Sequence, residues 1–422
     1  MKRKVIVLCL LAFPASLCLN PILAQTSSKV ASVKTNAKLK SNKRSAQFIK
    51  ANKPWSVRIA ESFIMRHPAN VIDDSVYNGK WTYDQGVFLE GLRQLYIKTN
   101  NKKYLNYIKT NIDMFVDNQG TIKTYKYTDF NIDNINTGRM LLWLYLVTND
   151  KRYKTAADTL RGQIKNQPRT KSGGFWHKKI YPYQMWLDGL YMAEPFYTWY
   201  SKLFNEVKNY DDIAYQFTLI RDKTRDSLTG LFYHAWDESL NQKWADPLTG
   251  RSPNFWSRSM GWYIMAIVDV LDFFPKDNPK RMELIDILKD LSVALLKVRD
   301  KNSALWYQVT NMADRTGNYH EASASCMFAY AFAKGANMGY LDKSYLKYAK
   351  ETFDGVINNL TTVEENGFVD LHYICKGAGL GGNPYRDGSF EYYISEQKKT
   401  NDLKGMGPFI MLAVELEKGK AI

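Results

Sequence analysis

The sequence predicts an all-α protein built as a closed double ring of six helical hairpins. Apolar residues from about position 55 to 417 recur at intervals of three and four, which is typical of amphipathic helices. Strand-like alternation is scarce, and no long Val/Ile run alternates with helices. Polar and apolar helical segments take turns with a period of roughly 50–70 residues, and repeated hairpins of this kind can close into two concentric rings. A solenoid or an irregular helical domain is the alternative.

The helical segments are of two kinds. One kind is polar and rich in Lys and Asp, and we expect it to form the outer ring: 55–67, 101–117, 151–167, 209–224, 278–298 and 341–360. The other is apolar and rich in Gly, Ala and aromatic residues, and we expect it to form the inner ring: 84–99, 134–148, 186–204, 257–274, 319–338 and 404–417.

The N-terminal fifty residues stand apart from this pattern. Three basic residues at 2–4 precede an apolar run that ends near Ala24, which is typical of a secretory signal peptide cleaved after Ala24. Residues 25–50 are basic and rich in Ser, Thr and Asn, so we expect a flexible leader there. Residues 51–422 then form a single domain, and the protein is expected to be secreted to the periplasm.

The formal net charge of +16 is concentrated in that N-terminal part, and the rest of the chain is about six charges positive. This balance argues against a nucleic-acid partner and is compatible with a small acidic substrate. No later apolar run is long enough to span a membrane. Cys326 and Cys375 remain after signal removal, and their spacing fits no metal site; a disulfide and a pair of buried thiols both stay open.

Two aspartates lie where a loop runs into an apolar helical segment. Asp133 is in TDFNIDNINTGR, and Asp188 is in YPYQMWLDGLYMAEPF. A helix N-terminus favours a carboxylate anion, whereas burial beside an aromatic ring and a second carboxylate favours the protonated acid. A balance of this kind suits a group that both donates and accepts a proton. Aromatic neighbours suit sugar rings, so we interpret the segments as part of a carbohydrate-active enzyme; simple helix capping is the alternative.

Other unusual residues collect just before the apolar helices. These segments are Trp81–Gln85, Thr128–Asn136, Trp176–Asp188, His234–Trp262, Asp314–Glu321 and Asp402–Gly407. Because loops that precede the inner helices of a ring meet at one end, we expect a single pocket there.

Several segments resemble glycoside hydrolase family 105, the unsaturated rhamnogalacturonyl hydrolases, which are related to the unsaturated glucuronyl hydrolases. They include KWTYDQGVFLEGL, NIDNINTGR, YPYQMWLDGLYMAEPFY, FYHAWDES, RSMGWYIMAIVDVL and GNYHEASASCMFAYA, and together they cover nearly all of 55–417 in order. The resemblance implies an (α/α)6 barrel, in agreement with the helix pattern. It implies neither a metal nor an organic cofactor.

The resemblance also implies an unusual chemistry. Polysaccharide lyases leave a C4=C5 double bond on the terminal uronic acid, and these enzymes hydrate that enol ether. Asp188 would protonate C4 and then take a proton from the water that adds to C5, after which the sugar opens and the linkage breaks. Asp133 would orient substrate or water and hold Asp188 partly protonated. The substrates implied are short rhamnogalacturonan fragments, with ulvan, arabinogalactan and glycosaminoglycan fragments as alternatives.

Further residues are expected to form the substrate site. They are His234, His177, Arg258, Trp186, Trp262, Trp244, Trp81, Tyr83 and Asp84. The two imidazoles would orient water or bond a hydroxyl, the planar guanidinium would meet the substrate carboxylate, and the tryptophans would form stacking walls. For each residue, core packing or an ion pair with another loop is the alternative.

Some features depart from the family pattern or stay open. His320, Gln397 and Tyr183 differ from the usual residues and are expected to border the leaving-group subsite. The glycine-rich segment 377–382 lacks the ending of a phosphate loop and is expected to be a mobile loop near the cleft. A conventional inverting hydrolase and a non-catalytic glycan-binding protein remain alternative functions. The sequence does not indicate an oligomeric state.

Overall fold

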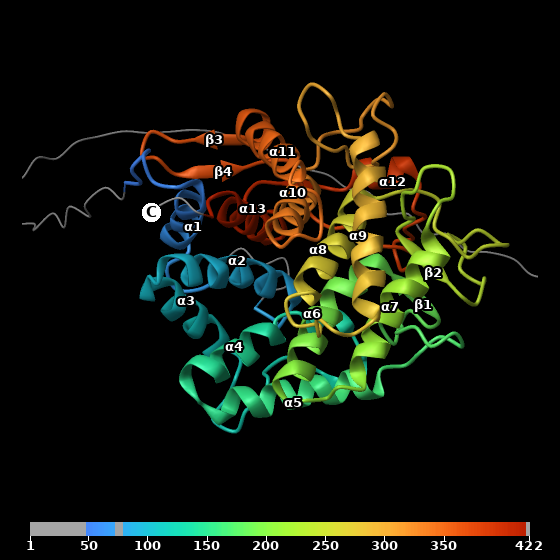
Figure 1. Ribbon diagram of the computed structural model, residues 1–422, viewed down its shortest axis with the longest axis horizontal. Coiled ribbons are helices and arrows are strands. Elements are labelled where there is room, and N and C mark those ends of the chain that lie inside the picture. Colours follow the sequence, from blue (N-terminus) through green and yellow to red (C-terminus); the bar gives the residue numbers. More distant parts are fainter. Residues whose placement is uncertain (1–47, 72–78, 419–422) are drawn as a thin grey trace, which may run out of the picture. The chain divides into compact units, whose positions relative to one another are not determined.

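The computed structural model describes residues 48–71 and 79–418 (Figure 1). The expected signal peptide and almost all of the expected leader lie outside these residues. Within them, the two predicted sets of helices are both present.

The inner ring consists of α2 (Tyr83–Thr99), α4 (Gly138–Thr148), α6 (Leu187–Leu203), α8 (Ser257–Val270), α10 (Ala322–Asn337) and α13 (Leu403–Leu416). The outer helices are α1 (Trp55–Arg66), α3 (Lys102–Asp113), α5 (Lys151–Asn166), α7 (Asn209–Thr224), α9 (Lys280–Lys297) and α11 (Tyr345–Leu360). Each inner helix contacts the next, and α13 returns to contact α2, so the ring closes. The predicted (α/α)6 barrel is confirmed.

Burial follows the two sequence patterns. Every residue of α8 is buried, whereas α3 and α11 bury one apolar stripe and leave the opposite face in water. Small residues let the inner helices approach closely. A Cβ atom on Gly407 would lie 2.5 Å from the carbonyl oxygen of Val87, so the contact between α13 and α2 depends on glycine at that position.

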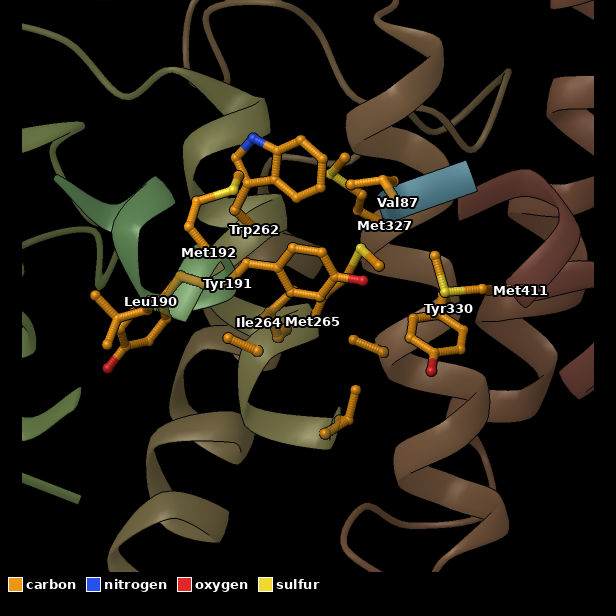
Figure 2. Close-up of a cluster of buried hydrophobic side chains, with 14 of the residues drawn as sticks. Val87, Leu190, Tyr191, Met192, Trp262, Ile264, Met265, Met327, Tyr330 and Met411 are labelled. Atoms are coloured by element: carbon orange, nitrogen blue, oxygen red, sulfur yellow. The ribbon is translucent and has the colours of Figure 1, made fainter. Parts of the chain in front are cut away.

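Aromatic and sulfur-containing side chains fill the middle of the ring. The indole of Trp262 on α8 is stacked on Tyr191 of α6, with 5.1 Å between ring centroids and 22° between planes. Figure 2 shows this pair with Met192 and Met327 beside it. Unbranched methionines adapt to the gaps that rigid rings leave, which suits the crowded centre of a small barrel.

Short strands connect the helices at the end of the ring that carries the site. They form three antiparallel pairs: β1 (Gln184–Trp186) with β2 (Ala235–Asp237), β3 (Thr361–Val363) with β4 (Val369–Leu371), and β5 (Ile374–Cys375) with β6 (Lys398–Lys399). A six-residue helix, α12 (Phe390–Ser395), and two 3-10 turns, η2 (Tyr127–Asp129) and η3 (Ile132–Ile135), complete the connections. The backbone N–H of Leu187 donates to the carbonyl of His234 at 3.0 Å, so the β1–β2 pair brings two distant segments to the start of α6.

The structure also bears on two questions that the sequence raised, the state of the two cysteines and the presence of a membrane-spanning helix. Cys326 and Cys375 are both buried and free. Within the described part of the chain, no helix combines the length and the apolar character needed to cross a membrane.

Candidate active site

A cavity of about 300 Å³, the central cavity, lies among the loops that precede the inner helices. It is lined by Tyr83, Asp133, His177, Lys178, Tyr181, Trp186, Asp188, Met192, Lys376, Gly377, Ala378, Arg386 and Glu396. The structure therefore brings the two predicted aspartates together, and with them His177, Trp186 and Tyr83 from the expected set.

Asp188 lies in the first turn of α6, where the helix N-terminus favours a negative charge. Its Oδ2 atom is 3.1 Å from Nε2 of His234, a fully buried residue just before β2. On its other side, Nδ1 of His234 is 2.8 Å from the hydroxyl of Tyr393 on α12. His234 thus lies behind the central cavity and contacts the carboxyl group from within the protein.

Asp133 has a different environment. It is part of η3, and its Oδ1 lies 3.1 Å from Nε2 of His177 while its Oδ2 lies 2.6 Å from Nζ of Lys178. Burial alone would raise the pKa of Asp133, but the charge of Lys178 and the contact with His177 outweigh it and lower the pKa below its usual range. Asp133 is therefore an anion, and Lys178 neutralises much of the charge that it would direct toward Asp188.

Three rings form an aromatic wall. Both His177 and Tyr181 are stacked on Trp186, at centroid distances of 4.8 Å and 4.9 Å and with planes within 11° and 14° of parallel. The indole N–H donates to the side-chain oxygen of Gln184 at 3.2 Å. Because these neighbours bury Trp186, the accessible part of the wall is formed largely by Tyr181.

Two positive side chains also line the central cavity. Arg386 is held in place by donating to the carbonyls of Gly381 and Leu380 at 2.8 Å and 3.1 Å and to the hydroxyl of Tyr181 at 3.0 Å. Lys376 lines the same cavity. A cavity with an ordered guanidinium and an ammonium group suits a ligand that carries a carboxylate.

Arg258 is not among the cavity residues, contrary to the expectation from the sequence. It is 1% exposed, donates to the carbonyl of Cys375 and to Oγ of Ser323 at 3.3 Å, and lies 3.8 Å from Oε1 of Glu321. The guanidinium therefore ties α8 to the segment that leads into Lys376. This is the loop-to-loop role that was the alternative for Arg258.

Several other predicted residues also lie elsewhere. Trp262 packs in the core against Tyr191, and Trp244 borders a separate hollow of about 450 Å³. Asp84 is buried and accepts hydrogen bonds from the Thr82 hydroxyl and, at 3.0 Å, from the N–H of Gln85, so it shapes the start of α2. His320 packs against Tyr307, with 4.3 Å between ring centroids, and does not line the central cavity.

The sequence analysis did not identify four charged residues that line the central cavity, nor Tyr393, which lies behind it. Lys178 directly follows His177 in FWHKK, and that adjacency could have identified it. Lys376, Arg386 and Glu396 lie in irregular C-terminal segments, and Tyr393 lies on α12, which is too short to show a helical period. None of these segments has a motif of paired acids. The expected position of the glycine-rich segment near the cleft is confirmed, since Gly377 lines the central cavity, and its mobility stays a prediction.

Two further hollows adjoin the central cavity. One, of about 510 Å³, shares Tyr83, Asp133 and Lys178 with it, and the other, of about 570 Å³, shares Tyr181 and Arg386. The central cavity is therefore flanked by two further hollows.

The helical double ring with two aspartates in its cavity is typical of carbohydrate-active enzymes of the (α/α)6 type. The sequence profile of Glycosyl Hydrolase Family 88 matches residues 55–420, and the chain belongs to this family. A solved family 105 glycoside hydrolase from C. acetobutylicum ATCC 824 is 44% identical, with a TM-score of 0.83 over 86% of this chain and 99% of that one. The resemblance to family 105 is confirmed.

Two curated relatives extend the comparison. Protein Atu3128 of Agrobacterium fabrum is 36% identical over 230 residues, which is 53% of this chain and 97% of the relative. The unsaturated rhamnogalacturonyl hydrolase YesR of Bacillus subtilis is 28% identical over 295 residues, which is 68% of this chain and 78% of that protein.

Proposed function

We propose that this glycoside hydrolase removes the terminal 4,5-unsaturated uronic acid from lyase-generated oligosaccharides by hydrating the C4=C5 enol ether. The observation that carries the proposal is the composition of the central cavity. The carboxyl group of Asp188 has the imidazole of His234 behind it, and the carboxyl group of Asp133 is an anion. Arg386 and Lys376 line the same cavity of about 300 Å³. The similarity to YesR supports the same chemistry.

In the proposed reaction Asp188 acts first as the acid and then as the base. Protonated Asp188 gives its proton to C4, and the positive charge that develops at C5 is shared with the ring oxygen. Water then adds to C5 and returns a proton to the Asp188 carboxylate, so the enzyme is restored and one water is consumed. The hemiketal opens to a ketone at C5, and the resulting hemiacetal at C1 releases the remaining sugar. The anion of Asp133 and the imidazole of His177 are placed to bind hydroxyl groups of the ring.

The carboxylate of the substrate is assigned to Arg386 and Lys376. The Arg386 guanidinium is oriented by two carbonyls and a phenol, so little side-chain entropy is lost when it binds an anion. Lys178 is less suited to this role because its ammonium group is already paired with Asp133.

The substrate is chosen through the sugar next to the unsaturated uronate. A lyase destroys the C4 stereocentre, so ends derived from galacturonate and from glucuronate are identical, and the discrimination must come from the neighbouring residue. Rhamnogalacturonan fragments are the first choice because of the family and YesR. Fragments of ulvan, arabinogalactan or glycosaminoglycans are the alternatives, and the two adjoining hollows provide room for any of these leaving groups.

A matched pair of disaccharides tests this function. One carries the unsaturated uronate and the other the saturated uronate on the same leaving sugar, and both are incubated in deuterated water. We expect cleavage of the unsaturated compound alone, with one deuterium at C4 of the product. Cleavage of the saturated compound, or a released sugar that keeps its double bond, would identify a conventional hydrolase. Binding of both compounds without turnover would identify a glycan-binding protein.

We also propose that the protein is exported to the periplasm. The basic and then apolar N-terminus that ends near Ala24 supports this location. Cell fractionation with N-terminal sequencing of the mature protein tests it: a periplasmic protein that begins after residue 24 is expected, and an uncleaved cytoplasmic protein would contradict it.

A further inference from the structure

Tyr393 lies behind the catalytic pair, outside the central cavity. It is 0% exposed, and its hydroxyl is 2.8 Å from Nδ1 of His234. Trp256 is stacked on Tyr393 at 6.0 Å and 17°, and it also contacts the imidazole of His234 at 4.7 Å. The edge of Trp186 approaches the imidazole at 5.4 Å and 68°. These rings hold the imidazole with Nδ1 toward the Tyr393 hydroxyl and Nε2 toward the Asp188 carboxyl group.

The hydroxyl of Tyr393 must act as the donor in this contact. Burial raises the pKa of Tyr393 well above its usual value, and the nearby groups Tyr392, Asp188, Asp387 and Cys375 act in the same direction, so the phenol keeps its proton. Among the described residues, His234 Nδ1 is the acceptor that this hydroxyl meets. A neutral imidazole that accepts at Nδ1 carries its own hydrogen on Nε2.

That hydrogen is the donor within reach of the catalytic carboxyl group. Nε2 of His234 and Oδ2 of Asp188 are 3.1 Å apart but outside hydrogen-bond geometry, and within residues 48–71 and 79–418 neither of these buried atoms has a hydrogen-bond partner. We assign the N–H to Oδ2, its nearest acceptor, which leaves Oδ1 to carry the proton that is transferred.

We infer that Tyr393 is a positioning residue for the general acid. It fixes His234 as the tautomer protonated on Nε2, and this tautomer reserves Oδ1 of Asp188 for the proton that goes to C4. The second half of the inference rests on the proposed hydration function. The first half, the tautomer, is a property of the free protein and does not depend on the substrate.

Nitrogen NMR of protein labelled with ¹⁵N-histidine tests the tautomer directly, because a protonated and a bare ring nitrogen resonate far apart. The chain has five histidines, and the spectrum of His234→Gln assigns the relevant signals. We expect His234 of the wild type to be protonated on Nε2, and Tyr393→Phe to give a mixture of both tautomers. A wild-type ring protonated on Nδ1, or an unchanged tautomer in Tyr393→Phe, would overturn the inference.

Kinetics separate positioning from stability. Tyr393→Phe is expected to lower kcat about tenfold and to leave KM within about twofold, because Tyr393 does not line the central cavity. Tyr263→Phe is the matched control, since it removes a buried hydroxyl that donates to the carbonyl of Phe217 at 2.8 Å, remote from the site. An equal loss of kcat in both variants would show that Tyr393 has only a structural role and does not position the acid. If the protein turned over no unsaturated substrate, the tautomer would still be decided by the spectrum.

Discussion

At the level of single residues, the two aspartates differ in the partner that each one faces. Asp133 faces the ammonium group of Lys178, which holds it as an anion. Asp188 faces the imidazole of His234, which can contact the carboxyl group in either protonation state. In the proposed mechanism, these surroundings give the two carboxyl groups of one cavity different roles, one in binding and one in proton transfer.

The ion pair of Asp133 predicts a pH-dependent stability. Because the pKa of Asp133 is lowered in the folded protein, the pair stabilises the fold above the ordinary Asp pKa of about 3.9, and this contribution is lost as the pH falls through the lowered value. Lys178→Met should therefore lower Tm most near neutral pH and progressively less toward strong acid. Lys376→Met is the control, since Lys376 forms no ion pair with a described acid. A pH-independent loss in Lys178→Met would contradict the assignment.

The carboxylate-binding role predicts a change in KM. Arg386→Met should raise KM for the unsaturated disaccharide about tenfold, which corresponds to ~1.4 kcal/mol, with a smaller effect on kcat. Arg315→Met removes an exposed arginine paired with Glu391 and should leave KM unchanged. Steady-state kinetics of the two variants decide the matter, and an unchanged KM in Arg386→Met would reassign the carboxylate to another cation.

At the level of elements, the sequence predicts the helices well and the connections poorly. The inner and outer helices are long and have a clear apolar period, so segments such as 84–99 and 209–224 agree with α2 and α7 within a residue. The helix expected at 319–338 begins only at Ala322, because Glu321 caps it by accepting from the N–H of Ala324. The strands have two or three residues and α12 has six, too few for any period to show.

The same limit explains the mixed outcome for the site. Motifs on helix starts locate Asp133, Asp188, His177 and Trp186, because their neighbours are distinctive. The start of an inner helix, however, carries cavity residues and core residues side by side, and the direction of a side chain is set by packing. Arg258 and Trp262 lie one turn apart at the start of α8, and both side chains are buried in the protein and do not line the central cavity.

The junction between α6 and η3 leads to a prediction at this level. A Cβ atom on Gly189 would lie 2.7 Å from Cδ1 of Ile132 and 3.1 Å from Nδ1 of His177. Gly189→Ala should push η3 and its Asp133 away from α6, destabilising the protein by about 1–3 kcal/mol and lowering kcat.

Gly162→Ala on α5 is the control for this substitution. Its new methyl group would meet Tyr127 at an ordinary 3.6 Å, so we expect unchanged kcat and a gain of about 0.4–1 kcal/mol. Thermal unfolding and kinetics of both variants test the contact. Full activity of Gly189→Ala would show that the junction does not position Asp133.

At the level of the whole molecule, buried charges link the inner helices. Asp269 on α8 lies 3.2 Å from Arg139 on α4, and its other oxygen accepts from Tyr330 and Lys334 on α10 at 2.7 Å and 2.8 Å. A buried ion pair adds little compared with an apolar contact, but the loss of one partner leaves the others charged and desolvated. The closed ring therefore depends on Asp269 although the residue is remote from the chemistry.

Removal of that carboxylate should be costly. Asp269→Asn is expected to lower the free energy of unfolding by about 3–5 kcal/mol, because Arg139 and Lys334 lose their shared anion. Asp354→Asn breaks an exposed pair with Lys350 on α11 and should cost about 0–0.5 kcal/mol. Denaturant unfolding of both variants makes the comparison, and similar midpoints would show that the network is not a structural requirement.

The central claim is that Asp188 is the acid that hydrates the C4=C5 bond. The most direct test follows the ultraviolet absorbance of an unsaturated rhamnogalacturonan disaccharide with the wild type and with Asp188→Asn. We expect the absorbance to decay with the wild type. With Asp188→Asn we expect the rate of decay to be at least about 10²-fold lower. Decay at comparable rates with both proteins would contradict the account, as would cleavage by the wild type that leaves the absorbance intact.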